Sequence, residues 1–158
     1  MNGNNAFATI GISDFASFKS RPQKTAEVYY KAVVSPHHPG IGKPIFSATR
    51  HLYFGTKETF SVIGQYFTDE VGEIISFVID RSLADGRHEV GGFGSPVAGL
   101  MTMSHEILYA KTGTIEFARK HEEGIDSITA TFNFEIEHRG QTYRVSEGKL
   151  FVIASGPL

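Results

Sequence analysis

Residues 127–138 alternate strictly between apolar and polar side chains. The apolar positions are Ile128, Ala130, Phe132, Phe134 and Ile136, and the polar ones are Thr129, Thr131, Asn133, Glu135 and Glu137. Because successive side chains of a strand point to opposite faces, this pattern predicts a long β-strand with one buried face. A helix would instead require apolar residues three or four positions apart.

The same period of two recurs along most of the chain, interrupted by glycine, proline and short polar turns. Expected strands in the second half are 105–111, 113–119, 127–138, 141–146 and 149–154, the last two separated by Gly148. Those in the first half are 6–12, 26–34, 45–54, 60–67 and 72–80. Residues 13–19, with Ser13 or Asp14 as the cap, are expected to form one short helix near the N-terminus.

These elements predict an all-β chain in which residues 1–158 form a single domain. Consecutive strands at short spacing are typical of an antiparallel β-sandwich or a flattened β-barrel, here of about nine to eleven strands. The pattern leaves the choice between sandwich and barrel open.

The composition excludes several kinds of function. No cysteine is present, which removes disulfides, thiolate metal sites and a cysteine nucleophile. The net charge of −2 and a pI near 6.4 argue against a nucleic-acid partner, since such domains usually have a pI above about 9. Histidine spacing gives no convincing metal site, and no motif indicates a cofactor.

No run of about 18 apolar residues is present, so we expect no membrane span. Residues 1–12 lack a basic stretch followed by a continuous apolar one, so we expect no signal peptide. The expected location is therefore the cytoplasm, with secretion by another route left open.

The C-terminal third resembles small, uncharacterised bacterial all-β domains, often lipoproteins. The similar segments are Gly113-Thr114-Ile115, Ala130-Thr131-Phe132-Asn133-Phe134 and Gly148-Lys149-Leu150-Phe151. The resemblance implies a β-sandwich or barrel fold. It implies no particular activity. The sequence lacks the cysteine of the lipoprotein members, and we expect it to lack their leader as well.

Two irregular segments interrupt the strands. Residues 35–44 contain three prolines together with His37 and His38, and residues 91–99 are rich in glycine and include Phe93. Loops held on a rigid scaffold often carry function, so we expect these two loops to share a binding site.

Residues 45–54 give the other candidate binding residues. On a single strand, Arg50 would share a face with Phe46 and Leu52, while His51 and Tyr53 would lie on the opposite face. Arg50 is either a rim residue with a packed aliphatic stem or an inward group that pairs with an anion. Tyr53 offers a ring and a hydroxyl, a combination suited to stacking on a sugar or contacting a partner.

The leading functional hypothesis is a non-enzymatic binding module whose ligand is a small molecule, a glycan or a protein. One alternative is a small-molecule isomerase, cyclase or hydrolase with His51 and Arg50 in a barrel lumen, which would require titratable groups with shifted pKa values. The other is a structural protein that self-associates through an exposed strand edge or apolar patch, which would make the chain a homo-oligomer.

Overall fold

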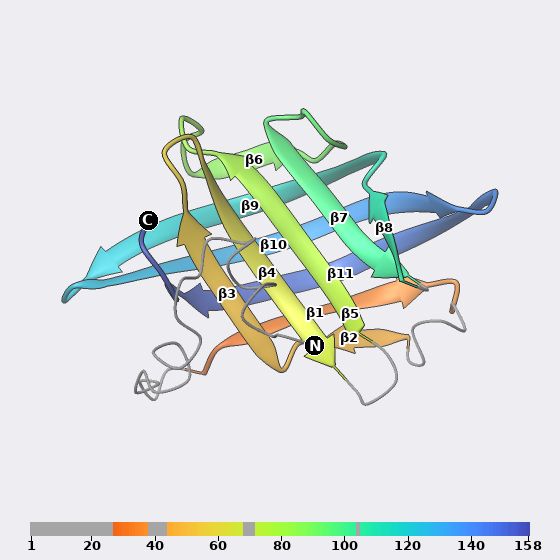
Figure 1. Ribbon diagram of the computed structural model, residues 1–158, viewed down its shortest axis with the longest axis horizontal. Coiled ribbons are helices and arrows are strands. Elements are labelled where there is room, and N and C mark those ends of the chain that lie inside the picture. Colours follow the sequence, from red (N-terminus) through yellow and green to blue (C-terminus); the bar gives the residue numbers. More distant parts are fainter. Residues whose placement is uncertain (1–26, 38–43, 68–71, 104) are drawn as a thin grey trace.

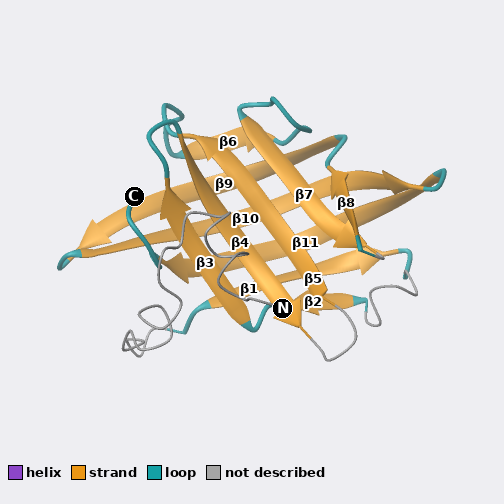
Figure 2. Cartoon of the chain, viewed as in Figure 1, coloured by secondary structure: helices purple, strands orange, loops and turns teal. Residues whose placement is uncertain are grey.

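The computed structural model describes residues 27–37, 44–67, 72–103 and 105–158, which form strands joined by loops (Figure 2). This part of the chain has no helix, and so none that could cross a membrane. The strands are β1 (Tyr29–Ser35), β2 (Ile45–Ser47), β3 (Arg50–Gly55), β4 (Thr59–Phe67), β5 (Gly72–Asp80), β6 (Gly86–Glu89), β7 (Val97–Met103), β8 (Glu106–Tyr109), β9 (Thr112–Glu122), β10 (Ile125–His138) and β11 (Gln141–Ile153).

The strands form two antiparallel sheets that lie face to face (Figure 1). One sheet has six strands in the order β2-β1-β11-β10-β9-β6, and the other has five in the order β3-β4-β5-β7-β8. The described sheets do not close into a barrel. The all-β prediction is therefore confirmed, and the barrel alternative is not. The helix expected at 13–19 and the strand expected at 6–12 lie outside the described residues.

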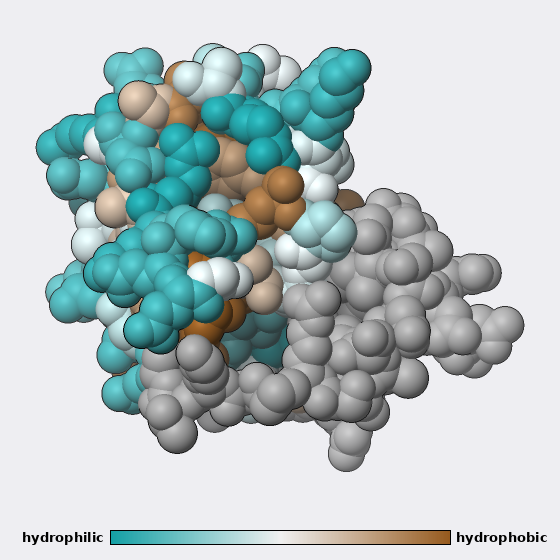
Figure 3. Space-filling view, turned by 90° about the vertical axis from the view of Figure 1, so that its left-hand side faces the viewer, coloured by the Kyte–Doolittle hydropathy of each residue, from teal (hydrophilic) through white to brown (hydrophobic). Residues whose placement is uncertain are grey.

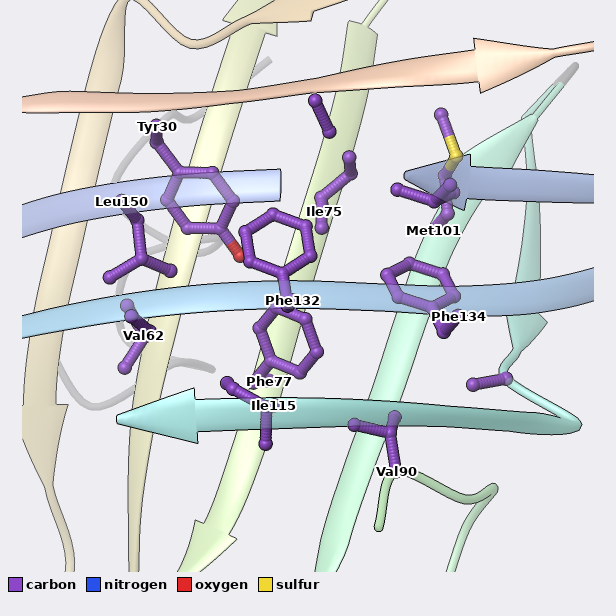
Figure 4. Packing of buried hydrophobic residues seen from close by; sticks show 14 of the residues in the cluster. Tyr30, Val62, Ile75, Phe77, Val90, Met101, Ile115, Phe132, Phe134 and Leu150 are labelled. Carbon is purple, nitrogen blue, oxygen red and sulfur yellow. The ribbon is translucent and has the colours of Figure 1, made fainter. Parts of the chain in front are cut away.

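Aromatic rings fill much of the space between the sheets. The Phe132 ring of β10 lies 4.9 Å from the Phe77 ring of β5 and 5.7 Å from the Tyr30 ring of β1, both in edge-to-face contact. Phe77 also makes an edge-to-face contact with Phe134 at 5.7 Å. Figure 4 shows these rings between strands of the two layers. Such contacts stabilise beyond the burial of apolar area alone.

The long β9-β10-β11 meander carries the alternation predicted from the sequence. On β10, Ile128, Ala130, Phe132, Phe134 and Ile136 are buried in the core, as expected. The residues between them face outward, so one face of the six-stranded sheet is the core and the other is polar. The predicted strands 141–146 and 149–154 are in fact one strand, β11, with an irregular register near Gly148.

The single strand predicted over 45–54 is wrong. The chain passes from the six-stranded to the five-stranded sheet at Ala48 and Thr49, so the segment forms β2 and β3. The Ala48 amide donates to the Tyr30 carbonyl of one sheet, and the Thr49 amide donates to the Gln65 carbonyl of the other, both at 2.9 Å. Alternation alone could not reveal this change of sheet, because both halves keep strand-like side chains.

The change of sheet also separates residues that the sequence placed on one face. Phe46 belongs to the core between the sheets. Leu52 and Phe54 belong to a smaller apolar cluster with Ile63, which pairs with Leu52 across β3 and β4. Because their neighbours Tyr53 and Val62 point into the main core, this smaller cluster lies on the outer face of the five-stranded sheet.

Phe77→Ala tests the central packing. Phe77 has no exposed surface, so its truncation should lower the free energy of unfolding by about 3–5 kcal/mol. Phe93→Ala is the control, because 87% of Phe93 is exposed and its loss should cost less than about 0.5 kcal/mol. Urea denaturation of the two variants measures the difference, and equal effects would contradict the described core.

Candidate functional site

A hollow of about 300 Å³ lies on the outer face of the six-stranded sheet. Four neighbouring strands of this sheet, β6, β9, β10 and β11, contribute its walls. The lining residues are Arg87, Thr114, Ile115, Glu116, Thr131, Phe132, Asn133, Glu147, Gly148 and Lys149. A volume near 300 Å³ is at the lower end of the range for small-ligand sites.

A β-bulge in β11 contributes Glu147 and Gly148 to one side of this hollow. Phe132 pairs with Gly148, but Phe134 pairs with Val145, so β11 has two residues, Ser146 and Glu147, opposite Asn133 alone. An extra residue of this kind bends the strand and redirects its side chains. The hollow therefore lies where the regular ladder of the sheet is interrupted.

Two residues of the bulge, Gly148 and Glu147, have unusual local surroundings or backbone angles. Gly148 points inward, and a Cβ atom there would overlap the Phe132 ring, so only glycine fits without a shift of the core. Glu147 has φ of 52°, in the left-handed region that side-chain-bearing residues rarely adopt. Non-glycine residues in such conformations are often found at functional sites.

The lining of the hollow is rich in polar groups. Asn133 Nδ2 donates a hydrogen bond of 2.9 Å to Thr114 Oγ1, which orients the amide so that its oxygen stays available. Thr131 is exposed between Glu116 and Lys149, its partners on the two adjacent strands. The hollow thus offers hydroxyl, amide, carboxylate and ammonium groups within a small area.

An aromatic ledge lies beside the hollow on the same face, formed by Tyr29 of β1 and Phe151 of β11. The two residues are register partners, and their ring centroids lie 6.4 Å apart. The Lys31 ammonium lies 5.5 Å from the centre of the Tyr29 ring. Phe151 is two residues along β11 from Lys149 in the hollow, a separation of about 7 Å. The hollow and the ledge together form one continuous surface.

The candidate binding residues of segment 45–54, which are Arg50, His51 and Tyr53, do not belong to this surface. Arg50 lies on the outer face of the five-stranded sheet, where Gln65 of β4 is its register partner. His51 and Tyr53 lie on the inner face, because Gly64, the partner of His51, packs against the Tyr30 ring. Arg50 and His51 therefore cannot meet in one site, and the described sheets enclose no barrel lumen for them.

His51 and Tyr53 are partly withdrawn from solvent. His51 Nε2 is buried and has no hydrogen-bond partner among the described residues. Burial lowers the pKa of His51 because it disfavours the charged imidazolium. Burial raises the pKa of Tyr53 to about 12, an effect that the Arg119 guanidinium opposes. Both side chains are therefore neutral at neutral pH, which suits groups inside a core.

Arg119 covers one end of the core near Tyr53. Its Nε atom forms an ion pair of 2.9 Å with Asp85 Oδ1, and its guanidinium lies 5.1 Å from the Phe60 ring and 5.5 Å from the Phe117 ring. Figure 3 shows the side of the molecule that lies on the left in Figure 1, where most described residues are hydrophilic and smaller apolar areas lie between them. These contacts close the core and leave Arg119 with a structural role.

The strands next to the two predicted loops lie on opposite edges of the six-stranded sheet. The first connects β1 to β2, and the second connects β6 to β7. His37 is exposed, and His38 lies outside the described residues. Residues 97–99 of the second segment belong to β7. The strand order therefore gives no support to one site shared by both loops.

Phe93 lies in an exposed aromatic pair instead. Its ring contacts that of Tyr109 in an edge-to-face arrangement at 6.0 Å. Tyr109 and the exposed Ile107 belong to β8, an edge strand of the five-stranded sheet. Self-association through this edge stays a prediction.

No group of three or more metal-ligating side chains occurs among the described residues. Comparisons with protein-family models, curated proteins and solved structures found no match. The chemistry of the hollow and the ledge therefore has to be inferred from their own residues.

His51→Gln tests the burial of the imidazole. Folding lowers the pKa of His51 below its ordinary value near 6.5, so around and below that pH His51 binds more protons in the unfolded chain than in the folded one. The free energy of unfolding therefore falls as the pH drops through that value. The variant should show a smaller loss of free energy of unfolding between about pH 7 and pH 5 than the wild type. His37→Gln, at an exposed position, should keep the wild-type slope. Equal slopes for all three proteins would contradict the burial of His51.

Proposed function

We propose that this protein is a non-enzymatic binding module with a β-sandwich fold, and that it binds a glycan on the outer face of the six-stranded sheet. The observation that carries the proposal is the polar hollow next to the aromatic ledge of Tyr29 and Phe151. This surface replaces the two loops as the proposed site.

A sugar has the two kinds of surface that this region complements. Its hydroxyl groups donate and accept hydrogen bonds, and Thr114, Thr131 and Asn133 provide matching groups. The C–H face of a sugar ring packs on aromatic side chains, which the ledge offers. Hollow and ledge lie side by side along β11, so a chain of two or more sugar units can contact both at once.

Binding is favoured over glycoside hydrolysis by the exposure of the two carboxylates. Glycosidases use a pair of acidic residues, one of which is kept protonated by a water-poor environment. Glu116 and Glu147 line the hollow, but both are exposed. A site on an open sheet face also lacks the means to exclude water that catalysis usually needs.

Thr131→Trp tests the site by filling the hollow. The indole should block access, so binding on an array of neutral, carboxylated and sulfated glycans should fall at least about ten-fold, equivalent to about 1.4 kcal/mol. Thr142→Trp is the matched control, since Thr142 is an exposed residue of β11 outside the hollow. Absence of glycan binding by the wild type, or equal binding by both variants, would contradict the proposal.

A further inference from the structure

Two lysines lie directly opposite each other next to the hollow. Lys31 of β1 and Lys149 of β11 are register partners, and both side chains are exposed on the outer face. Partners in an antiparallel pair have Cα atoms about 4.5–5.5 Å apart, and like charges placed so are destabilising. The fold therefore tolerates a local repulsion at this position.

Three other cations of the same sheet have carboxylate partners. The ion pairs are Arg119 with Asp85 at 2.9 Å, Lys120 with Glu122 at 3.0 Å and Arg144 with Glu135 at 2.8 Å. Lys31 and Lys149 make no ion pair with any residue in the described part of the chain, and the Lys31 ammonium lies over the Tyr29 ring. Two adjacent ammonium groups thus remain available for an external anion.

The neighbours of the two lysines define where an anion would lie. Thr131 is the partner of Lys149 on its other side and adds a hydroxyl donor. Glu116 lies one strand further, about 10 Å from Lys149, a distance at which salt largely screens its charge. Glu147 lies two residues before Lys149, toward the bulge. An anionic group is therefore favoured on the β1 side, between Lys31 and Lys149.

We propose that Lys31 and Lys149 form an anion-binding subsite and that the glycan of the proposed function is acidic, with a carboxylate or sulfate group held by the two ammonium groups. This inference rests on the proposed function for the sugar part of the ligand. The anionic group would be held next to the Tyr29 ring, while neutral sugar hydroxyls contact Thr131 and Asn133 in the hollow.

The subsite itself is tested with inorganic sulfate, which carries the charge without the sugar. Backbone amide NMR spectra are recorded during titration with sodium sulfate and with sodium chloride at matched ionic strength, to separate binding from screening. We expect saturable sulfate-specific shifts at Lys31, Thr131 and Lys149. Lys31→Gln and Lys149→Gln should each weaken sulfate binding about five-fold. Lys120→Gln, which removes a paired cation of the same sheet, should leave it unchanged.

The two proposals fail in different ways. Sulfate shifts that do not saturate, or that persist in both lysine variants, would overturn the anion subsite. On the glycan array, we expect binding to the carboxylated or sulfated members and loss of this preference in Lys31→Gln and Lys149→Gln. Equal binding of neutral and acidic glycans would overturn the proposal that the glycan is acidic, and it would leave the glycan-binding proposal standing. Saturable sulfate binding without any glycan binding would support the subsite and contradict the proposed function.

Discussion

The contact between the Phe132 ring and the backbone of β11 links the inside of this protein to its outer surface. Phe132 packs against Phe77 of the facing sheet and Tyr30 of its own, so the ring cannot move away from Gly148. Only a residue without a Cβ atom fits beneath it. The bulge at Ser146–Gly148 lies at this point, and the hollow forms on the opposite side of the same strand.

This arrangement gives the proposed site a rigid base. Outward-facing residues of the hollow on β9 and β10 alternate with core residues of the same strand: Thr131 and Asn133 flank Phe132, and Glu116 lies between Ile115 and Phe117. Burial of the alternate positions fixes the backbone and thus the directions of the polar side chains. A binding surface prepared in this way loses little conformational entropy when a ligand arrives.

Alternation in the sequence was sufficient to predict the all-β class and the faces of β10, because one buried face imposes a period of two. It did not predict the passage between sheets at Ala48 and Thr49, since both halves of that segment are strand-like. That error placed Arg50 on one face with Phe46, whereas Phe46 packs between the sheets and Arg50 lies on the outer face of the five-stranded sheet.

The hollow was missed for a different reason. Its residues run from Arg87 to Lys149 and meet only through strand pairing, so no local motif marks them. One available signal is the glycine at position 148, where the alternation predicts a break between two strands and the structure has one strand with a bulge. Interpreted as a bulge, it would have indicated an irregular point on the polar face.

Deletion of Glu147 tests most directly whether the bulge creates the binding site. Removing this one residue leaves Ser146 opposite Asn133 and restores regular pairing on either side, so the core faces of β11 are unchanged. The measurement is the affinity of the deletion variant for the best glycan found on the array, with its amide exchange pattern as the check on folding. We expect a folded protein whose affinity has fallen at least about ten-fold. A folded variant that binds as tightly as the wild type would contradict this expectation.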